Sequence, residues 1–174
     1  LDAGCFGIIC PMINTRAECE AFVGACRYPP RGYRSFGPLR AALYAGPDYA
    51  ARAEQIVITM AMIETRQAVE NIAEIVQTPG LDAIYIGPSD LGQSLGFGAK
   101  MDPTEPEVIA ALDHVLDTAR RHGIVVGMHT GSVEYARHMA AKGMQLLTIG
   151  SDARLLAGAA QRTVAAFKGA ATAY

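Results

Sequence analysis

Two acidic residues stand at places in the sequence where they could share a metal ion. Glu64 directly follows the mostly apolar run 56–63, and Asp90 comes three residues after the apolar run 83–87. Such runs are typical of buried parallel strands, whose carboxyl ends meet at one edge of a sheet, so the two carboxylates are expected to lie close together. Two carboxylate ligands leave most of an octahedron to water and substrate oxygens, which suits Mg2+ or Mn2+ acting as a Lewis acid. The alternative is that Glu64 pairs with a base such as Arg66 and that Asp90 caps the next turn.

Glycines lie on both sides of the second acid, in the run Gly87-Pro88-Ser89-Asp90-Leu91-Gly92. They predict a sharp turn at the end of the strand that presents backbone N–H groups to a bound anion such as a carboxylate. An ordinary tight turn without a ligand is the alternative.

One histidine falls on the same predicted edge. His129 directly follows the apolar run 124–128, so it is a candidate for a catalytic or substrate-side role, against the alternative of a loop residue hydrogen-bonded locally. Asp152 follows the apolar run 146–150, where Gly150-Ser151-Asp152 could instead cap the final helix. The other three histidines, His114, His122 and His138, fall in helical stretches.

The elements that must position these residues alternate along the chain. Short apolar, β-branched runs and stretches of helical spacing repeat about every 30 residues, which is typical of βαβα folds. The predicted strands are 7–12, 56–64, 83–87, 124–128 and 146–150, and the predicted helices are 16–27, 48–55, 66–77, 105–122, 132–142 and 153–168. Capping-box spacing marks two helix starts, at Thr15 with Glu18 and at Thr104 with Glu107, and Gly123 and Gly143 mark two helix ends.

The segment 28–47 interrupts this alternation and contains four of the nine prolines. We expect an irregular loop on the side of the active site, with a short strand at 34–37. Its arginines could bind the distal carboxylate of a diacid substrate or could belong to a solvated loop: Arg27, Arg31, Arg34 and Arg40.

The fold class is α/β in a single domain, 1–174. Five strand–helix units can form an open doubly wound sheet or part of a (β/α)8 barrel, and no G-x-G-x-x-G follows the first strand to favour the former. A complete barrel needs about 250 residues. The 174 residues of this chain therefore account for five units and part of a sixth.

The composition limits the classes of binding partner that are expected. A net charge of −2, with no run of more than two Lys or Arg, argues against nucleic acid and against an anionic membrane surface. The apolar runs are too short to cross a bilayer and the first residues lack the features of a signal peptide, so a cytoplasmic protein is expected. All four cysteines lie within the first 26 residues and read as small buried hydrophobes, with a reactive thiol or a metal ligand as the alternative.

Several motifs together resemble one family. They are Pro11-Met12, Arg27-Tyr28-Pro29-Pro30-Arg31-Gly32, Ile63-Glu64-Thr65-Arg66, Gly87-Pro88-Ser89-Asp90-Leu91 and Ile149-Gly150-Ser151-Asp152. Their order along the whole chain is similar to that of the HpcH/HpaI aldolases, class II enzymes of the 4-hydroxy-2-oxoheptanedioate and 2-dehydro-3-deoxyglucarate type on a TIM barrel. The resemblance implies that this chain holds about the last five βα units, the carboxyl-terminal two thirds of the barrel.

The resemblance also implies roles for individual residues. The metal ligands of the family match Glu64 and Asp90, and its contacts to the substrate carboxylate match the segment Gly87-Pro88-Ser89-Asp90, through the backbone of Ser89 and Asp90. Met62 takes the place where the family often has a glutamine that hydrogen-bonds the substrate. Asp2 matches an aspartate that tunes the histidine base of the family. That base and an enolate-stabilising arginine lie upstream of this aspartate, on strands that this chain does not contain.

The activity implied is cleavage of a 4-hydroxy-2-oxo acid to pyruvate and an aldehyde, with Mg2+, Mn2+ or Co2+ stabilising the enolate, in a homo-oligomer (a trimer or hexamer). The three lysines, Lys100, Lys142 and Lys168, lie outside the predicted strands, which argues against a Schiff-base aldolase. Two alternatives stay open: a lyase of the citrate-lyase-β or malyl-CoA-lyase type, and a truncated, non-catalytic remnant that still binds metal.

Overall fold

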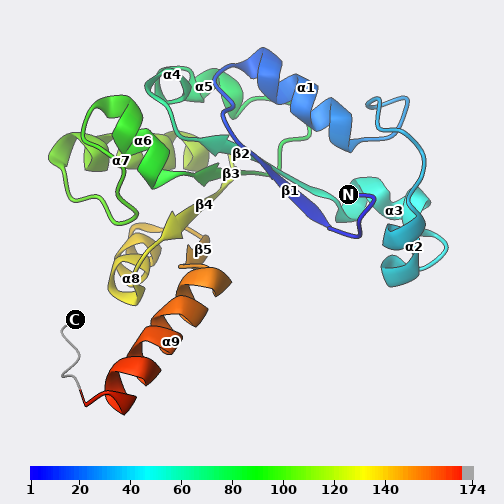
Figure 1. The fold of residues 1–174 in the computed structure, drawn as a ribbon. Coiled ribbons are helices and arrows are strands. Elements are labelled where there is room, and N and C mark those ends of the chain that lie inside the picture. Colours follow the sequence, from blue (N-terminus) through cyan, green and yellow to red (C-terminus); the bar gives the residue numbers. More distant parts are fainter. Residues whose placement is uncertain (170–174) are drawn as a thin grey trace.

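The computed structural model describes residues 1–169 as a curved, five-stranded parallel sheet with helices (Figure 1). The strands are β1 (Gly7–Cys10), β2 (Ile58–Ile63), β3 (Ala83–Ile86), β4 (Val125–Thr130) and β5 (Leu146–Ile149). Each strand pairs with the next one in the chain, in the order β1-β2-β3-β4-β5. The order never reverses, as it must in a doubly wound sheet, so this is part of a barrel.

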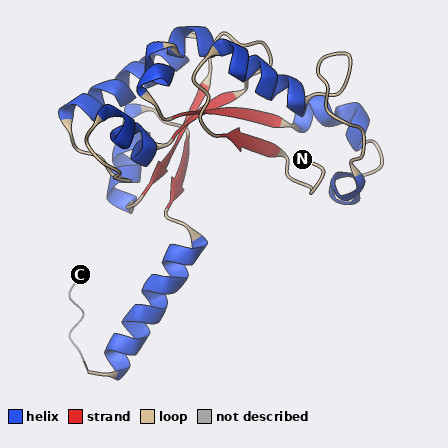
Figure 2. Ribbon diagram, turned by 45° about the horizontal axis from the view of Figure 1, so that its top comes forward, coloured by secondary structure: helices blue, strands red, loops and turns tan. Residues whose placement is uncertain are grey.

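The helices between the strands lie on one face of the sheet, and the last helix extends away from it (Figure 2). They are α1 (Arg16–Cys26), α2 (Leu39–Ala45), α3 (Tyr49–Ile56), α4 (Arg66–Glu70), α5 (Ile72–Ile75), α6 (Pro88–Leu95), α7 (Pro106–Arg121), α8 (Val133–Lys142) and α9 (Asp152–Phe167). No helix within residues 1–169 combines the length and the apolar character that crossing a membrane requires.

The two faces of the sheet differ in their surroundings. Side chains on the outer face are buried against the helices: Ala61, Ile63, Ile84, Ile86, Val126 and Met128. Side chains that alternate with them point to the inner face, where four apolar residues are each more than a third exposed: Ile9, Ile58, Val125 and Leu146. The prediction of buried strands is therefore wrong at these four positions of the inner face. This apolar inner face is the side that further units of a closed barrel would cover.

Three helical segments differ from the sequence-based prediction. Helix α2 was not predicted, and the short strand expected at 34–37 is absent. The helix expected over 66–77 is divided at Asn71 into α4 and α5. Helix α6 begins at Pro88, where a turn was expected; proline suits the first position of a helix because the N–H it lacks would have no partner there.

The loop after α1 was predicted to lie on the side of the active site, and that prediction is wrong. Arg27 donates hydrogen bonds to the carbonyl oxygens of Val57 and Gly80 and pairs with Asp82 at 3.1 Å. Val57 directly precedes β2, and Gly80 and Asp82 lie within three residues of the start of β3. The loop therefore lies at the amino edge of the sheet, opposite the edge that follows the strands. A helix that connects parallel strands runs back to the amino edge, so the segment that follows it begins there.

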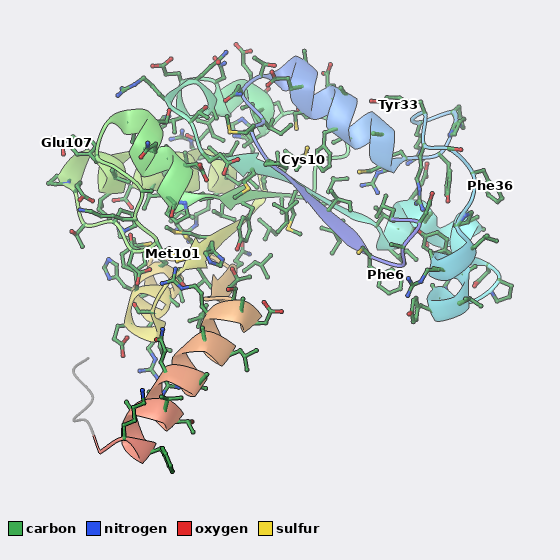
Figure 3. The ribbon with its side chains drawn as sticks, in the orientation of Figure 1. Phe6, Cys10, Tyr33, Phe36, Met101 and Glu107 are labelled. Carbon is green, nitrogen blue, oxygen red and sulfur yellow. The ribbon has the colours of Figure 1, made fainter. Side chains whose placement is uncertain are left out.

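The remaining arginines of this loop have partners of their own. Arg31 pairs with Glu54 at 3.1 Å, Arg34 pairs with Asp2, and Arg40 contacts Tyr44. Figure 3 shows Tyr33 and Phe36 of the loop toward the α2–α3 end of the molecule, away from α6. These arginines are thus not placed to bind the distal carboxylate of a substrate at the carboxyl edge.

Candidate metal and substrate site

Glu64 is a buried carboxylate at the carboxyl edge of the sheet. It directly follows β2, and only 2% of its surface is exposed. The backbone N–H of Met12 donates to its Oε1 atom at 2.8 Å. Arg66 points elsewhere, toward the carbonyl oxygen of Leu95. Within residues 1–169, no Lys, Arg or His forms an ion pair with Glu64, so the alternative of pairing with Arg66 is wrong.

The loop after β1 is built to present the Met12 N–H to Glu64. Met12 has a φ of 59°, a left-handed conformation that is uncommon for a residue with a side chain. Asn14 fixes this loop: its side chain donates to the Met12 carbonyl oxygen and accepts from the hydroxyl of Thr65, the residue after Glu64. Asn71 in turn donates to the carbonyl oxygen of Asn14 at 2.8 Å. No local pattern in the sequence indicated Met12 and Asn14 as supports of the site.

The second acid, Asp90, stands three residues after Gly87, and Gly87 packs against Glu64. Burial raises the pKa of Glu64, the hydrogen bond from Met12 lowers it in part, and the negative charge of Asp90 raises it further. A Cβ on Gly87 would lie 2.3 Å from Oε2 of Glu64 and 2.7 Å from the terminal methyl of Met62. The glycine is thus required by the close approach of the Glu64 carboxylate, which the sequence analysis had attributed to a turn.

These observations fit a divalent cation. A buried carboxylate with one hydrogen-bond donor, no cationic partner among residues 1–169 and a second carboxylate nearby is short of positive charge. Carboxylate oxygens are the ligands that Mg2+ and Mn2+ prefer. The described residues contain no group of three or more His, Cys, Asp or Glu that could hold a metal. An ion held by Glu64 and Asp90 would therefore take its other ligands from substrate and water.

Helix α6 offers a site for an anion beside these acids. Gly87 is its N-cap and Pro88 its first residue, so the N–H groups of Ser89 and Asp90 belong to the first turn, where no acceptor exists within the helix. Such N–H groups and the helix dipole favour a carboxylate. Gly92 has a different role, because a Cβ there would lie 2.6 Å from the carbonyl oxygen of Gly98.

His129 lies on the inner face near the carboxyl end of β4. Its Nδ1 atom is 2.7 Å from the hydroxyl of Thr148 on β5, and the same hydroxyl hydrogen-bonds the phenol of Tyr85 on β3. Burial raises the pKa of Tyr85, which the hydrogen bond with Thr148 partly offsets. His129 thus belongs to β4 and its partner lies on another strand, so the alternative of a loop residue hydrogen-bonded locally is wrong. Its ring shares the inner face with Met62.

Two other candidates lie apart from the acids or have a local partner. Asp2 precedes β1 at the amino edge and pairs with the buried guanidinium of Arg34 at 2.5 Å, so the structure does not bring it to Glu64. Ser151 is the N-cap of α9 and accepts from the N–H of Arg154, and Asp152 follows in the first turn. The capping interpretation of Gly150-Ser151-Asp152 is confirmed.

Known proteins share this sequence and fold. The sequence profile of the family described as HpcH/HpaI aldolase/citrate lyase matches residues 1–159. The chain belongs to the HpcH/HpaI family. A hydroxypyruvate/pyruvate aldolase of Rhizorhabdus wittichii is 45% identical over 165 residues, which cover 95% of this chain and 66% of that protein. A 4-hydroxy-2-oxo-heptane-1,7-dioate aldolase of Escherichia coli is 34% identical over 176 residues, covering 99% and 66%.

A solved structure extends the likeness to three dimensions. The HpcH/HpaI family protein of Burkholderia cenocepacia superposes with a TM-score of 0.85 at 28% identity, covering 96% of this chain and 66% of that one. The family and the barrel fold expected from the motifs are confirmed. This HpcH/HpaI chain spans about two thirds of the length of the relatives it matches.

Proposed function

We propose that this chain is the metal- and substrate-binding part of a divalent-metal-dependent aldolase that cleaves a 4-hydroxy-2-oxo acid to pyruvate, or to a close 2-oxo acid, and an aldehyde. The observation that carries the proposal is the buried, uncompensated Glu64 carboxylate beside Asp90 and the first turn of α6. The aldolase names of two relatives with 45% and 34% identity support the reaction class.

In this proposal, Glu64 and Asp90 hold Mg2+, Mn2+ or Co2+. When bound, the ion draws electrons from the keto group of a 2-oxo acid, which assists the breaking of a carbon–carbon bond. The N–H groups of Ser89 and Asp90 bind the substrate carboxylate, while Gly87 and Pro88 fix the start of α6 against Glu64. Met62, paired with Tyr85 in the sheet register, supplies an apolar wall where the family often has a glutamine.

The proton chemistry needs a base that the described residues do not place beside the acids. Glu64 is occupied as a ligand and as the acceptor of the Met12 N–H. On the family pattern the base precedes Leu1, and Asp2 would orient it. In the structure Asp2 forms an ion pair with Arg34. Its orienting role is therefore a prediction that depends on the preceding units.

A metal titration tests the site. Stabilisation of the chain by Mn2+ or Mg2+, followed by thermal unfolding, should reach about 2.7 kcal/mol at a metal concentration of 100 times Kd. Glu64→Gln and Asp90→Asn should abolish it, whereas Asp152→Asn, an acid at the end of β5 that is used in the α9 turn, should not. Stabilisation that survives both site variants would contradict the proposal.

Turnover is measured separately, as pyruvate released from 4-hydroxy-2-oxoheptanedioate in the presence of Mn2+. Metal binding with turnover supports the aldolase. Metal binding without turnover, unless restored by the missing barrel units, indicates a non-catalytic remnant. Cleavage only of a coenzyme A thioester would replace the proposal with a lyase of the citrate-lyase or malyl-CoA type.

A further inference from the structure

A chain of hydrogen bonds crosses the inner face of the sheet near the proposed site. It runs from the phenol of Tyr85 on β3 to the hydroxyl of Thr148 on β5 and from there, over 2.7 Å, to Nδ1 of His129 on β4. None of the roles assigned above to the metal and the substrate carboxylate uses this chain. The three residues come from three neighbouring strands and their side chains share the inner face.

Gly127 makes the chain possible. Tyr85 reaches Thr148 by crossing β4 at the position of Gly127, its partner in the register. A Cβ at Gly127 would lie 2.9 Å from the Tyr85 ring. Only 4% of the surface of Tyr85 is exposed. The absence of a side chain at Gly127 therefore leaves room for the Tyr85 ring to cross β4 and bring its phenol to Thr148.

The available protons allow one continuous direction for the chain. Thr148 has a single hydroxyl proton, and Tyr85 has no hydrogen-bond acceptor within residues 1–169 other than Thr148. A buried phenol that donated to nothing would lose its hydrogen bond with water without replacement. Tyr85 therefore donates to Thr148, which keeps its own proton, and Nδ1 of His129 is the ring nitrogen within reach of that proton. When Nδ1 accepts this proton, the proton of the neutral imidazole sits on Nε2.

We propose that Tyr85 and Thr148 are positioning residues that hold His129 in its Nε2–H tautomer, so that this N–H binds a hydroxyl oxygen of a hydroxylated 2-oxo acid at the Glu64–Asp90 site. The inference rests on the proposed function, because that function places the substrate carboxylate at α6 and the keto oxygen at the metal. Once the carboxylate and the keto oxygen of the substrate are bound in this way, the substrate oxygen that remains for a donor on β4 is a hydroxyl. Within residues 1–169, Nε2 of His129 has no other hydrogen-bond partner.

The tautomer is tested first, without metal or substrate. Long-range 1H–15N spectra of the histidine-labelled chain at about pH 8, where imidazole is neutral, report which ring nitrogen carries the proton, and His129→Gln assigns the signals. We expect a single Nε2–H tautomer in the wild type and a mixture in Thr148→Val. Thr148→Ser, which keeps the hydroxyl, should restore the single tautomer, and Tyr85→Phe should weaken it. Thr163→Val, on exposed α9, is the matched control and should change nothing.

The specificity is tested with two ligands of equal size. 3-Hydroxypyruvate and 2-oxobutanoate differ by a hydroxyl in place of a methyl, and calorimetry in the presence of Mg2+ gives their Kd values. The wild type should favour the hydroxylated acid by about five- to tenfold, the worth of one hydrogen bond. His129→Leu and Thr148→Val should lose that preference and leave the Kd of 2-oxobutanoate unchanged.

The outcomes separate this inference from the proposed function. A wild-type His129 that is a tautomer mixture or an Nδ1–H tautomer overturns the positioning role, whatever the metal does. Equal affinity for the two acids in the wild type overturns the hydroxyl specificity. Failure of both acids to bind, with the single tautomer present, counts against the metal site and against the ligand assigned to His129, while the positioning role stands.

Discussion

At the scale of single residues, the site depends on one carboxylate kept in an unfavourable place. Glu64 is buried, receives one hydrogen bond and lies near a second negative charge, so its pKa is raised above the ordinary value of 4.5. A carboxyl whose pKa is raised on folding stabilises the protein below its unfolded pKa, and that contribution is lost as the pH rises through the folded value. At neutral pH, without metal, the charge of Glu64 therefore lowers the free energy of unfolding.

This sign gives a pH-dependent prediction for the metal-free chain. Glu64→Gln removes the charge and keeps an oxygen that accepts from the Met12 N–H. The variant should unfold at a higher temperature than the wild type at pH 7, and the difference should vanish below about pH 4.5, where the wild-type carboxyl is neutral. The measurement is thermal unfolding across this range with a chelator present. A variant that is less stable at pH 7 would show that Glu64 is compensated by a group other than a metal.

The close approach at Gly87 gives a second prediction. A methyl group there would meet Oε2 of Glu64 at 2.3 Å and displace it, as well as the Met62 side chain. Gly87→Ala should cost about 1–3 kcal/mol in the free energy of unfolding, the usual range for overpacking, and should weaken Mn2+ binding. Gly37→Ala is the control, because nothing lies within 4 Å of its Cβ position. If Gly87→Ala and Gly37→Ala changed the affinity for Mn2+ equally, Gly87 would not shape the site.

At the scale of elements, helix ends decide where the functional groups lie. Thr15 caps α1 with a complete capping box, in which the Glu18 side chain accepts from the backbone N–H of Thr15. The same spacing at Thr104 and Glu107 is not used: α7 begins with Glu105 as its N-cap and Pro106 as its first residue, and there is no side-chain cap. Pro106 fixes the start of the helix one residue later than the capping-box pattern requires.

The pair of threonines therefore tests the capping assignments. Thr15→Ala should lower the free energy of unfolding by about 1 kcal/mol, the usual cost of losing a cap. Thr104→Ala should leave it within about 0.5 kcal/mol of the wild type, as for a surface substitution. Urea unfolding of both variants under the same conditions measures the difference. An equal loss in the two variants would indicate that Thr104 caps α7 in solution.

At the scale of the whole molecule, the chain presents apolar surface that a complete barrel would cover. The inner face carries Ile9, Ile58, Val125 and Leu146, and α9 has no buried residue within residues 1–169 while exposing Leu155, Leu156, Val164 and Phe167. The unpaired edges of β1 and β5 add backbone groups able to pair with another chain. We expect the chain to associate with itself, and a trimer or hexamer is the proposed assembly.

Association through α9 has a direct test. The double variant Leu155→Glu and Leu156→Glu places two charges on exposed α9 and should shift sedimentation toward smaller species at equal concentration. Leu39→Glu, at a leucine on α2 that is even more exposed, is the control and should leave the distribution unchanged. If the α9 variant sediments as the wild type does, the association uses the strand edges or the inner face instead.

The sequence by itself determined the repeating strands and the family, and it indicated Glu64 and Asp90 as candidate metal ligands. These follow from local patterns, since an apolar run ending in an acid indicates both a buried strand and its functional end. The same patterns left the order of strands open between a doubly wound sheet and a barrel, and the family resemblance implied the barrel, in which successive parallel units are neighbours. Thr15, Gly123 and Gly143 were likewise recognisable as helix ends, because caps depend on residues close in sequence.

Only the tertiary structure decided what depends on contacts between distant segments. The partner of Glu64 is a backbone N–H 52 residues away, and the need for Gly87 comes from a carboxylate on another strand. The loop arginines have their places because α1 returns the chain to the amino edge, which no pattern within the loop records. The chain of Tyr85, Thr148 and His129 exists because three strands lie side by side, since hydrogen-bond partners are chosen by distance in space and not in sequence.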